Sequence, residues 1–462
     1  MDNLLSQLKS IVGDRGWLSD PEALTPHLTE WRERWLGRTP LMVMPRTTQQ
    51  VADIVRACRA ANTPIVIQGG NTGLCGGAIP AGDGNEILLS MSRMNRVREV
   101  SAEDFSMVAE AGCILAELQD EARRVERLFP LSLSAEGSCQ IGGNIATNAG
   151  GINVLKFGTT RDQVLGLEVV LPDGRIWNGL RSLRKDTAGY DLKQVFIGSE
   201  GTLGVITAAS LKLYPSVTYL KTAMVALPTP ESAIELLGRI RGAMRDQVYA
   251  FELISDRAMR FVTRRIPGCR DPFDAPHKWY VLLEVAGERE TLEGFLMECY
   301  EAGLFESAVM AGSIAQGDEL WRIRHSISEA QKFEGASLKH DISVPIGKIP
   351  QFLDQASSRI MHLVPEARIV AFGHVGDGNL HFNISQPGNV EAAAFLDRSD
   401  DLSEIVYATV SEFNGSISAE HGIGQAKKEL LRKYRSDVEL DMMRTIKAAF
   451  DPDNLFNPGK VL

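Results

Sequence analysis

The segment EGSCQIGGNIATNAGG, at residues 136–151, is rich in glycine and other small residues. Backbone without Cβ atoms lets several N–H groups converge on an anion such as a pyrophosphate. Two other segments have a similar composition, QGGNTGLCGG at 68–77 and GSEGTLG at 198–204. A single such loop is typical of a turn, but three in one half of the chain indicate a long dinucleotide lying across them. The loop at 68–77 lacks the GK[ST] of a Walker A loop, and its GGNTG does not match the G-x-G-x-x-G turn, so neither common nucleotide-binding fold is indicated.

The sequence around these loops alternates between helical and strand patterns. LGLEVVLPDGRIW, at 165–177, predicts a hairpin about Pro-Asp-Gly, and Pro215 marks a boundary. The elements predicted beyond it are a helix, a strand and another helix, at 231–244, 278–287 and 291–303. That order indicates an antiparallel sheet covered by helices, and the chain is predicted to be an α+β protein.

Composition and charge exclude several classes of protein. The formal net charge is −10 and there is no lysine-rich arm, so nucleic-acid binding is not expected. No apolar run reaches the roughly 18 residues that a membrane span needs, and residues 1–17 lack the long apolar stretch of a signal peptide. We therefore expect a cytoplasmic protein. The six cysteines are scattered without a C-x-x-C pair, which argues against an iron–sulfur cluster.

GHVGDGNLHFN, at 373–383, sets two histidines around a tight turn. The pattern predicts a strand ending at His374, a reversal through VGDGN, and a returning strand on which His381 and Asn383 share a face. Such a hairpin can place His374 beside His381, and two neutral imidazoles make half of a metal site.

A third ligand is predicted from SISAEHGIG, where Glu420 ends a strand-like run and His421 follows it. The glycines after this pair let Glu420 reach a metal while His421 reaches the substrate. Singly, each of these residues is more often a structural or solvated side chain. Their grouping inside two glycine-punctuated turns favours a metal site.

Four motifs resemble, in the same order, those of flavoproteins of the vanillyl-alcohol oxidase superfamily: QGGNTGLCGG, SAEGSCQIGGNIATNAGG, LRKDTAGYDLKQVFIGSEGTLGVIT and NPGK. The resemblance extends over nearly the whole chain and is strongest to the D-2-hydroxyglutarate and D-lactate dehydrogenase branch. It implies a PCMH-type FAD-binding domain of two subdomains at 1–215, an antiparallel-sheet substrate domain at 216–415, and a C-terminal segment, 416–462, that returns to the flavin.

The resemblance also implies which residues meet the FAD. Relatives with covalent flavin often carry a histidine in the first glycine-rich loop, and here that place is taken by Asn71, so the FAD is expected to be dissociable. The residues expected to bind it are Gly69, Gly70, Asn71, Thr72, Gly73, Gly76, Gly77, Ser138, Gly142, Gly143, Asn144, Thr147, Asn148, Gly150, Gly151, Glu200, Gly204, Ile206 and Asn457.

The histidine motifs also resemble those of the family. They make His374, His381 and Glu420 ligands of a divalent ion, expected to be zinc. His421 corresponds to the catalytic base, which also contacts the substrate.

The basic segment 319–341 has a counterpart in the family as well. A solvated helix face is its simplest interpretation, but a helix would place Arg324 and Ser328 at i, i+4, and arginine offers a fork for a carboxylate. By resemblance Arg324, Ser328 and Lys339 hold the substrate's carboxylates, with Asn383 assisting. The serine stands where relatives often have threonine, which retains the hydroxyl and loses a methyl. Two cations suit a diacid better than lactate.

The expected function is oxidation of a D-2-hydroxy acid, D-2-hydroxyglutarate or D-malate, to the 2-oxo acid. Electrons would leave the flavin for a protein acceptor, for which the family expectation is electron-transfer flavoprotein, with oxygen or a quinone as the alternatives. A homodimer is expected. The alternatives are a D-lactate dehydrogenase or glycolate oxidase flavin subunit, a non-catalytic flavin-binding subunit, and a metal-dependent hydrolase, whose ligands are also His, His and Glu.

Overall fold

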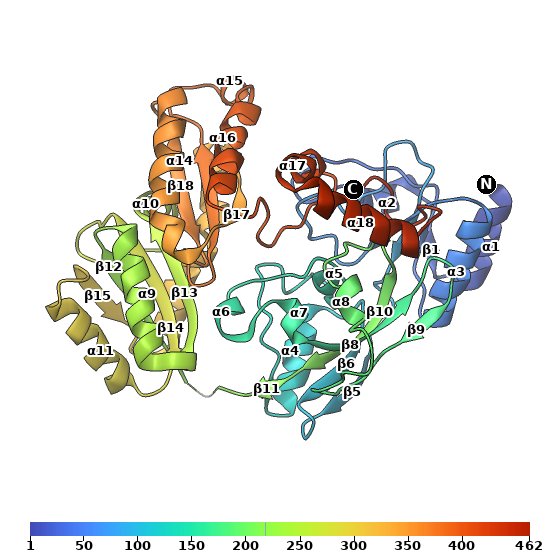
Figure 1. The fold of residues 1–462 in the computed structure, drawn as a ribbon, viewed down its shortest axis with the longest axis horizontal. Coiled ribbons are helices and arrows are strands. Elements are labelled where there is room, and N and C mark those ends of the chain that lie inside the picture. The colour runs from blue at the N-terminus through green and yellow to red at the C-terminus, as the bar shows by residue number, and fades with distance from the viewer. Residues whose placement is uncertain (218) are drawn as a thin grey trace. The chain divides into compact units, whose positions relative to one another are not determined.

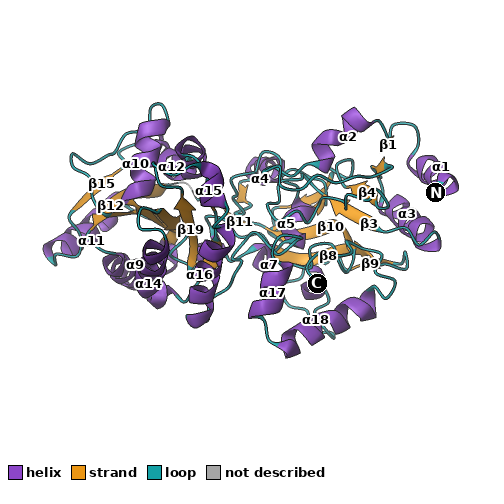
Figure 2. Ribbon diagram, turned by 90° about the horizontal axis from the view of Figure 1, so that it is seen from above, coloured by secondary structure: helices purple, strands orange, loops and turns teal. Residues whose placement is uncertain are grey.

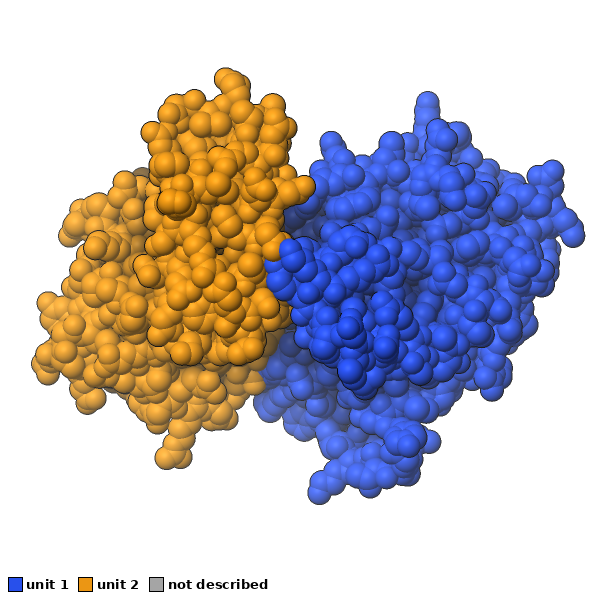
Figure 3. Space-filling view, turned by 45° about the horizontal axis from the view of Figure 1, so that its top comes forward, with its two compact units in different colours: residues 1–150, 157–216, 420–462 blue, residues 151–156, 217–419 orange. Residues whose placement is uncertain are grey.

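The computed structural model describes residues 1–217 and 219–462, and Figure 1 shows the path of the chain. These residues divide into two compact units, which Figure 3 colours separately. Unit 1 comprises residues 1–150, 157–216 and 420–462, and unit 2 comprises 151–156 and 217–419. The units therefore divide at 216 rather than at the predicted 215, and at 419 rather than 415. Residues 151–156 belong to unit 2 although the residues on both sides of them belong to unit 1, which was not predicted.

One layer of unit 1 is a four-stranded sheet in the order β1-β2-β4-β3, in which β2, β4 and β3 run parallel. Helix α3 is capped by Thr47, whose side chain accepts a hydrogen bond from Gln50 N–H, and it buries an apolar stripe that includes Ile54 and Val55. The elements of this part are α1 (Asp2–Val12), β1 (Trp17–Leu18), α2 (Pro21–Leu28), β2 (Met42–Val43), α3 (Thr48–Ala60), β3 (Ile65–Gln68) and β4 (Ile87–Ser90).

The second sheet of unit 1 has five antiparallel strands in the order β5-β6-β10-β8-β9. The predicted hairpin is present as the antiparallel pair β8 and β9. The elements here are β5 (Val97–Ser101), β6 (Ser106–Glu110), α4 (Leu115–Arg124), β7 (Arg127–Leu128), α5 (Ile141–Ala146), α7 (Thr160–Gln163), β8 (Val164–Val170), β9 (Ile176–Asn178), α8 (Lys193–Phe196), β10 (Val205–Lys212) and β11 (Tyr214–Pro215). The final helices of the chain, α17 (Lys428–Tyr434) and α18 (Asp437–Phe450), also belong to unit 1.

Unit 2 is built on an antiparallel sheet in the order β15-β12-β14-β13-β18-β19-β16, with β17 also paired to β19. Figure 2 shows α10 and α12 on one face of this sheet and α9 and α14 on the other. Because both faces are covered, β13 is buried along its whole length and reads as a nearly continuous apolar run. The predicted antiparallel sheet covered by helices is confirmed.

The elements of unit 2 begin with α6 (Val154–Phe157), whose last residue falls in unit 1, β12 (Leu220–Leu227), α9 (Pro230–Met244), η1 (Arg245–Gln247), β13 (Val248–Ser255), α10 (Asp256–Arg265), β14 (Trp279–Ala286), α11 (Arg289–Glu301) and β15 (Ser307–Met310). They continue with α12 (Ile314–His325), α13 (Ile327–Ala330), η2 (Gln331–Glu334), β16 (Ser337–Leu338), β17 (Asp341–Ser343), η3 (Ile346–Lys348), α14 (Ile349–Leu363), β18 (Arg368–Gly373), β19 (Asn379–Ser385), α15 (Ala392–Leu396) and α16 (Ser399–Glu412).

The helix that was predicted to carry both Arg324 and Ser328 is divided into two. Helix α12 ends at His325, the short α13 and the 3-10 helix η2 follow, and Gly335 at φ +96° ends the helical stretch before β16. Arg324 and Ser328 therefore belong to different helices. Arg324 is buried and Ser328 is exposed.

No helix among the described residues is long and apolar enough to cross a membrane.

Candidate functional site

A pocket in unit 1 is lined by the three glycine-rich segments, by the C-terminal tail and by His421. Its walls come from the loop after β3, the region of α5, and the segment that leads into β10. The predicted FAD-binding residues that line it are Gly69, Gly70, Asn71, Thr72, Gly73, Gly77, Gly142, Gly143, Asn144, Thr147, Glu200, Gly204, Ile206 and Asn457.

The remaining predicted FAD residues do not line this pocket: Gly76, Ser138, Asn148, Gly150 and Gly151. A Cβ on Gly76 would lie 3.0 Å from the ring of Trp35, so that glycine serves packing. The Asn148 side chain accepts a hydrogen bond from Arg161 N–H at 2.9 Å. Gly76 and Asn148 therefore have structural contacts outside the pocket lining, a distinction that composition does not reveal.

The glycines of the pocket have two different roles. A Cβ on Gly142 would lie 2.6 Å from the Cβ of Ala111, and one on Gly70 would lie 2.1 Å from the carbonyl oxygen of Ser138, so these residues allow segments to pack closely. Gly143 and Gly73 have no atom within 4 Å of the corresponding position. Side chains there would extend into open space of the pocket, which glycine leaves for a ligand.

Two buried polar atoms at the pocket have no hydrogen-bond partner among the described residues: Gln140 Oε1 and Asn144 Oδ1. An unsatisfied buried acceptor costs about 1–3 kcal/mol. The N–H and hydroxyl donors of FAD would satisfy them, so the residues present fit this cofactor. Asn71 instead points its amide to the Pro26 and Thr29 carbonyl oxygens, at 3.2 and 3.0 Å.

His421 is held at the pocket by the loop that follows it. The Glu200 carboxylate accepts hydrogen bonds from Ile423 N–H and Gly424 N–H, both at 2.7 Å, and burial raises the pKa of Glu200 even though these bonds oppose it. Asn457 donates to the Glu200 carbonyl oxygen at 2.7 Å and accepts from Ile67 N–H. The predicted return of the tail to the flavin pocket is present.

In unit 2, strands β18 and β19 form the predicted hairpin, and the ring centroids of His374 and His381 lie 5.8 Å apart. The turn requires glycine at Gly378, which has φ +91° and whose Cβ would lie 2.6 Å from the Val344 carbonyl oxygen. Asp341 on β17 lies directly opposite His381, and their side chains form an ion pair at 3.8 Å.

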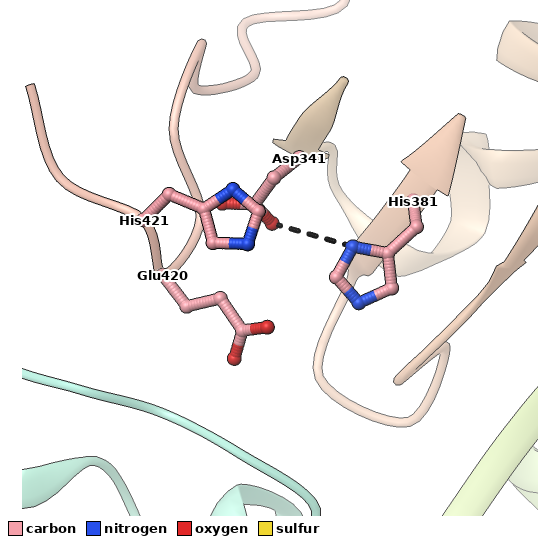
Figure 4. A group of neighbouring side chains, drawn as sticks. All are labelled: Asp341, His381, Glu420 and His421. Carbon is pink, nitrogen blue, oxygen red and sulfur yellow. Dashed lines mark ion pairs between the residues drawn. The ribbon is translucent and has the colours of Figure 1, made fainter. Parts of the chain in front are cut away.

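Glu420 and His421 directly follow Ala419, where the chain leaves unit 2. A bridge between Ser343 and Ser416 brings this part of the chain beside β17. It is a loop rather than the strand-like run that was predicted. Figure 4 shows the resulting group, in which ligand atoms of Asp341, His381, Glu420 and His421 lie within 4.8 Å of one another. Imidazole nitrogens with carboxylate oxygens are a donor set that fits zinc.

Asp341 was not predicted, because its place opposite His381 comes from strand pairing. The predicted ligand His374 lies outside this group. It is buried, and its Nδ1 is 2.5 Å from the carboxylate of Glu252 on β13.

Glu252 also bonds Arg324, whose Nε donates to it at 2.7 Å. Burial would raise the pKa of Glu252, but His374 and Arg324 lower it to about 2. The terminal nitrogens of Arg324 make no hydrogen bond among the described residues, and its guanidinium lies 5.0 Å from the ring centroid of Phe372.

The other predicted substrate residues are placed differently. Lys339 is half-buried directly after β16, and Ser328 is exposed on α13. Asn383 donates to Gln331 Oε1 at 3.0 Å and accepts from His340 N–H at 3.2 Å. Its amide therefore joins neighbouring segments of unit 2.

Comparison with known proteins gives two family matches, FAD binding domain at residues 39–179 and the C-terminal domain of FAD linked oxidases at residues 218–461. A D-2-hydroxyglutarate dehydrogenase of Stutzerimonas stutzeri is 36% identical over 99% of this chain and 98% of its own length. One from Xanthomonas citri is 37% identical over 96% of this chain and 93% of its own. The mitochondrial D-2-hydroxyglutarate dehydrogenase of Arabidopsis thaliana is 37% identical over 99% of this chain and 81% of its own length.

Solved structures agree on the fold. p-Cresol methylhydroxylase matches with a TM-score of 0.80 at 16% identity, over 100% of this chain and 96% of its own. Alkyldihydroxyacetonephosphate synthase matches with a TM-score of 0.76 at 17% identity, over 99% of this chain and 84% of its own. With most of the predicted FAD-binding residues gathered at one pocket, the chain belongs to the FAD-linked oxidases and is an FAD-dependent oxidoreductase.

Proposed function

We propose that this chain oxidises D-2-hydroxyglutarate, or a close diacid such as D-malate, to the 2-oxo acid with the aid of a divalent ion. The observation that carries the proposal is the place of His421, which lines the FAD pocket and belongs to the candidate metal group. The names of the relatives support the choice of substrate.

When bound, FAD supplies the hydride acceptor and the divalent ion supplies a Lewis acid for the substrate hydroxyl. The His421 imidazole takes the hydroxyl proton, and its position is fixed by the bonds of Ile423 and Gly424 to Glu200. His381, Glu420 and Asp341 offer ligand atoms to the ion, and His374 offers Nε2.

The substrate's carboxylates are matched by cations of unit 2. Arg324 has its terminal nitrogens available for a bidentate contact, since Glu252 occupies only its Nε. Lys339 supplies the second cation, after β16. Two cations suit a diacid better than a monoacid.

The remaining features of the proposal concern the cofactors and partners. Zinc is the ion proposed because the donors are imidazole nitrogens and carboxylate oxygens. Non-covalent FAD is proposed because Asn71 stands where a linking histidine would be, with its amide bonded to backbone oxygens. The electrons would pass to a separate protein such as electron-transfer flavoprotein, and the chain would form a homodimer in the cytoplasm.

The experiment is anaerobic mixing of the yellow protein with D-2-hydroxyglutarate, D-malate, D-lactate, glycolate and the L-forms, with and without a chelator, while flavin absorbance is followed. Chelator-sensitive bleaching by D-diacids is the expected result. Bleaching by D-lactate or glycolate alone would overturn the diacid assignment, and no bleaching by any acid would overturn the proposed oxidation.

A pair of variants tests the proposed base. His421→Ala should retain FAD and lose bleaching by at least about 100-fold, the range that general-base catalysis contributes. His362→Ala, at an exposed position on α14, is the matched control and should bleach at the wild-type rate. Wild-type bleaching by His421→Ala would refute the assignment of the base.

A further inference from the structure

We propose that Glu252 is a positioning residue, whose carboxylate sets His374 for the metal and Arg324 for the substrate carboxylate at the same time. This inference rests on the proposed function, because it assigns a role within the same site.

The geometry of Glu252 is that of a shared anchor. It lies on β13 with no exposed surface. One carboxylate oxygen lies 2.5 Å from His374 Nδ1, and the other accepts from Arg324 Nε at 2.7 Å. These partners are 122 and 72 residues away in the sequence, on the end of the β18 hairpin and in the last turn of α12. A single side chain thus joins three distant segments of unit 2.

The bond to Glu252 decides which nitrogen of His374 can hold a metal. An ionised carboxylate only accepts hydrogen bonds, so Nδ1 of His374 must be the donor. In the neutral imidazole the lone pair then lies on Nε2, so this is the nitrogen that would coordinate a metal. A carboxylate behind a ligating histidine is the arrangement that fixes ring orientation and raises ligand basicity.

The same carboxylate orients Arg324. With Nε bonded to Glu252 and the guanidinium against the ring of Phe372, the plane of the guanidinium is fixed. The edge formed by the two terminal nitrogens remains for a carboxylate of the substrate. Glu252 thereby couples the metal ligand to the carboxylate clamp.

A buried ion pair by itself adds little stability compared with apolar side chains of similar size. A positioning role explains a fully buried charge on β13 better than a purely structural one. Glu284 on the neighbouring strand β14 shows the contrast. It accepts from Trp321 Nε1 and Thr222 Oγ1, which are neutral donors, and burial raises its pKa.

The test compares Glu252→Gln with Glu284→Gln as the matched control. A glutamine at 252 has only one acceptor atom, so it cannot accept one hydrogen bond on each of two oxygens as the carboxylate does. At 284 the single oxygen of glutamine can still accept from the neutral donors Trp321 and Thr222. Zinc affinity is measured by equilibrium dialysis of metal-depleted, FAD-loaded protein, and KM and kcat for D-2-hydroxyglutarate are measured on the zinc-loaded enzyme.

Glu252→Gln is expected to bind zinc about 10- to 100-fold more weakly and to raise KM, with FAD content unchanged, since the FAD pocket lies in unit 1. Glu284→Gln should stay within about twofold of wild type for both quantities. Zinc affinity and KM within about twofold of wild type in Glu252→Gln would overturn the positioning role.

A measurement on the unaltered protein covers the case in which Glu252→Gln does not fold. Long-range proton–nitrogen NMR of histidine-labelled, zinc-loaded enzyme should show His374 protonated at Nδ1, and a proton on Nε2 would overturn the role. The failure of the proposed function would be seen separately, as wild-type protein that binds no stoichiometric zinc or oxidises no D-2-hydroxy acid.

Discussion

Ion pairs with arginine favour the ionised form of two buried carboxylates in unit 2, Glu252 and Glu334. Glu334 is the clearest case outside the candidate site, since Arg264, Arg265 and Arg368 all bond its side chain. Burial would raise the pKa of Glu334, but the bonds to the three arginines lower it below its ordinary value. A group whose pKa is lowered by folding stabilises the folded state most when it is ionised.

The pH dependence of stability should reveal this carboxylate. The stabilisation by Glu334 is fully present above the ordinary glutamate pKa of about 4.3 and is lost as the pH falls through the lower value of the folded state. Glu334→Gln should therefore unfold at a lower temperature than wild type at pH 7, with the gap narrowing toward pH 3. Calorimetry at pH 7 and pH 3 measures the difference in unfolding temperature between the two proteins. An equal difference at both pH values would contradict the assignment.

Arg324 should also matter for stability. Arg324→Ala would leave the Glu252 carboxylate buried beside a single partner, a change that costs about 3–5 kcal/mol in other proteins. Arg239→Ala removes an exposed pair with Glu235 on α9 and should cost less than about 1 kcal/mol. Chemical denaturation measures the free energy of unfolding of both variants. Equal losses of stability would show that the buried pair contributes no more to stability than the exposed pair.

At the scale of elements, tight turns and short helices position the residues of the candidate sites. The β18–β19 hairpin depends on Gly378, which has φ +91° and packs against the Val344 carbonyl oxygen. A residue with a Cβ there forces the turn to open, at a cost of roughly 1–3 kcal/mol.

Gly378→Ala should therefore lower zinc affinity by shifting the hairpin that carries His374 and His381. Gly388→Ala, after β19, is the control, because no atom lies within 4 Å of its Cβ position and its φ is ordinary. Equilibrium dialysis with zinc compares the two. Equal affinity in both variants would show that the turn is not critical for the metal.

Helix α5 gives a similar test for FAD. Gly143 faces open pocket, so Gly143→Val should weaken FAD binding at least about 10-fold while the fold is retained, because its branched side chain occupies space that the ligand needs. Gly137→Val, also with open space but outside the pocket lining, should bind FAD as wild type does. Fluorescence titration of the apoprotein with FAD measures the difference, and equal dissociation constants would place the cofactor elsewhere.

At the scale of the whole molecule, the FAD pocket and the hairpin with its Glu252 anchor belong to different compact units. The FAD pocket is built entirely from unit 1, including its C-terminal tail, which pairs with β3 through Phe456 and Ile65. The hairpin, the Glu252 anchor and Arg324 belong to unit 2. We therefore expect FAD binding to stabilise unit 1 more than unit 2.

Saturation with FAD at 100 times its dissociation constant should stabilise unit 1 by about 2.7 kcal/mol. Hydrogen exchange followed by mass spectrometry should show slower exchange at the segments 67–78, 139–147 and 200–206, while β13 and β14 of unit 2 change little. Protection that rises first in β13 and β14 would show that FAD binds by a different surface.

Local sequence was sufficient for the features that depend on near neighbours. The glycine-rich loops, the β8–β9 and β18–β19 hairpins and the helices at α3 and α18 follow from spacing and turn residues a few positions apart. The resemblance of long motifs in the correct order then predicted the family. The prediction of one helix through Arg324 and Ser328 was wrong, because α12 ends at His325 and Ser326 separates it from α13.

Tertiary structure alone decided the groups whose members are far apart in the chain. Asp341 reaches His381 because β17 pairs with β19, and Glu252 meets His374 and Arg324 because β13 lies beside β18 and beneath α12. Asn383 lies on the predicted strand, yet its amide is bonded within unit 2. Sequence patterns report which face a side chain takes on its own element, whereas the partner across the sheet is set by long-range packing.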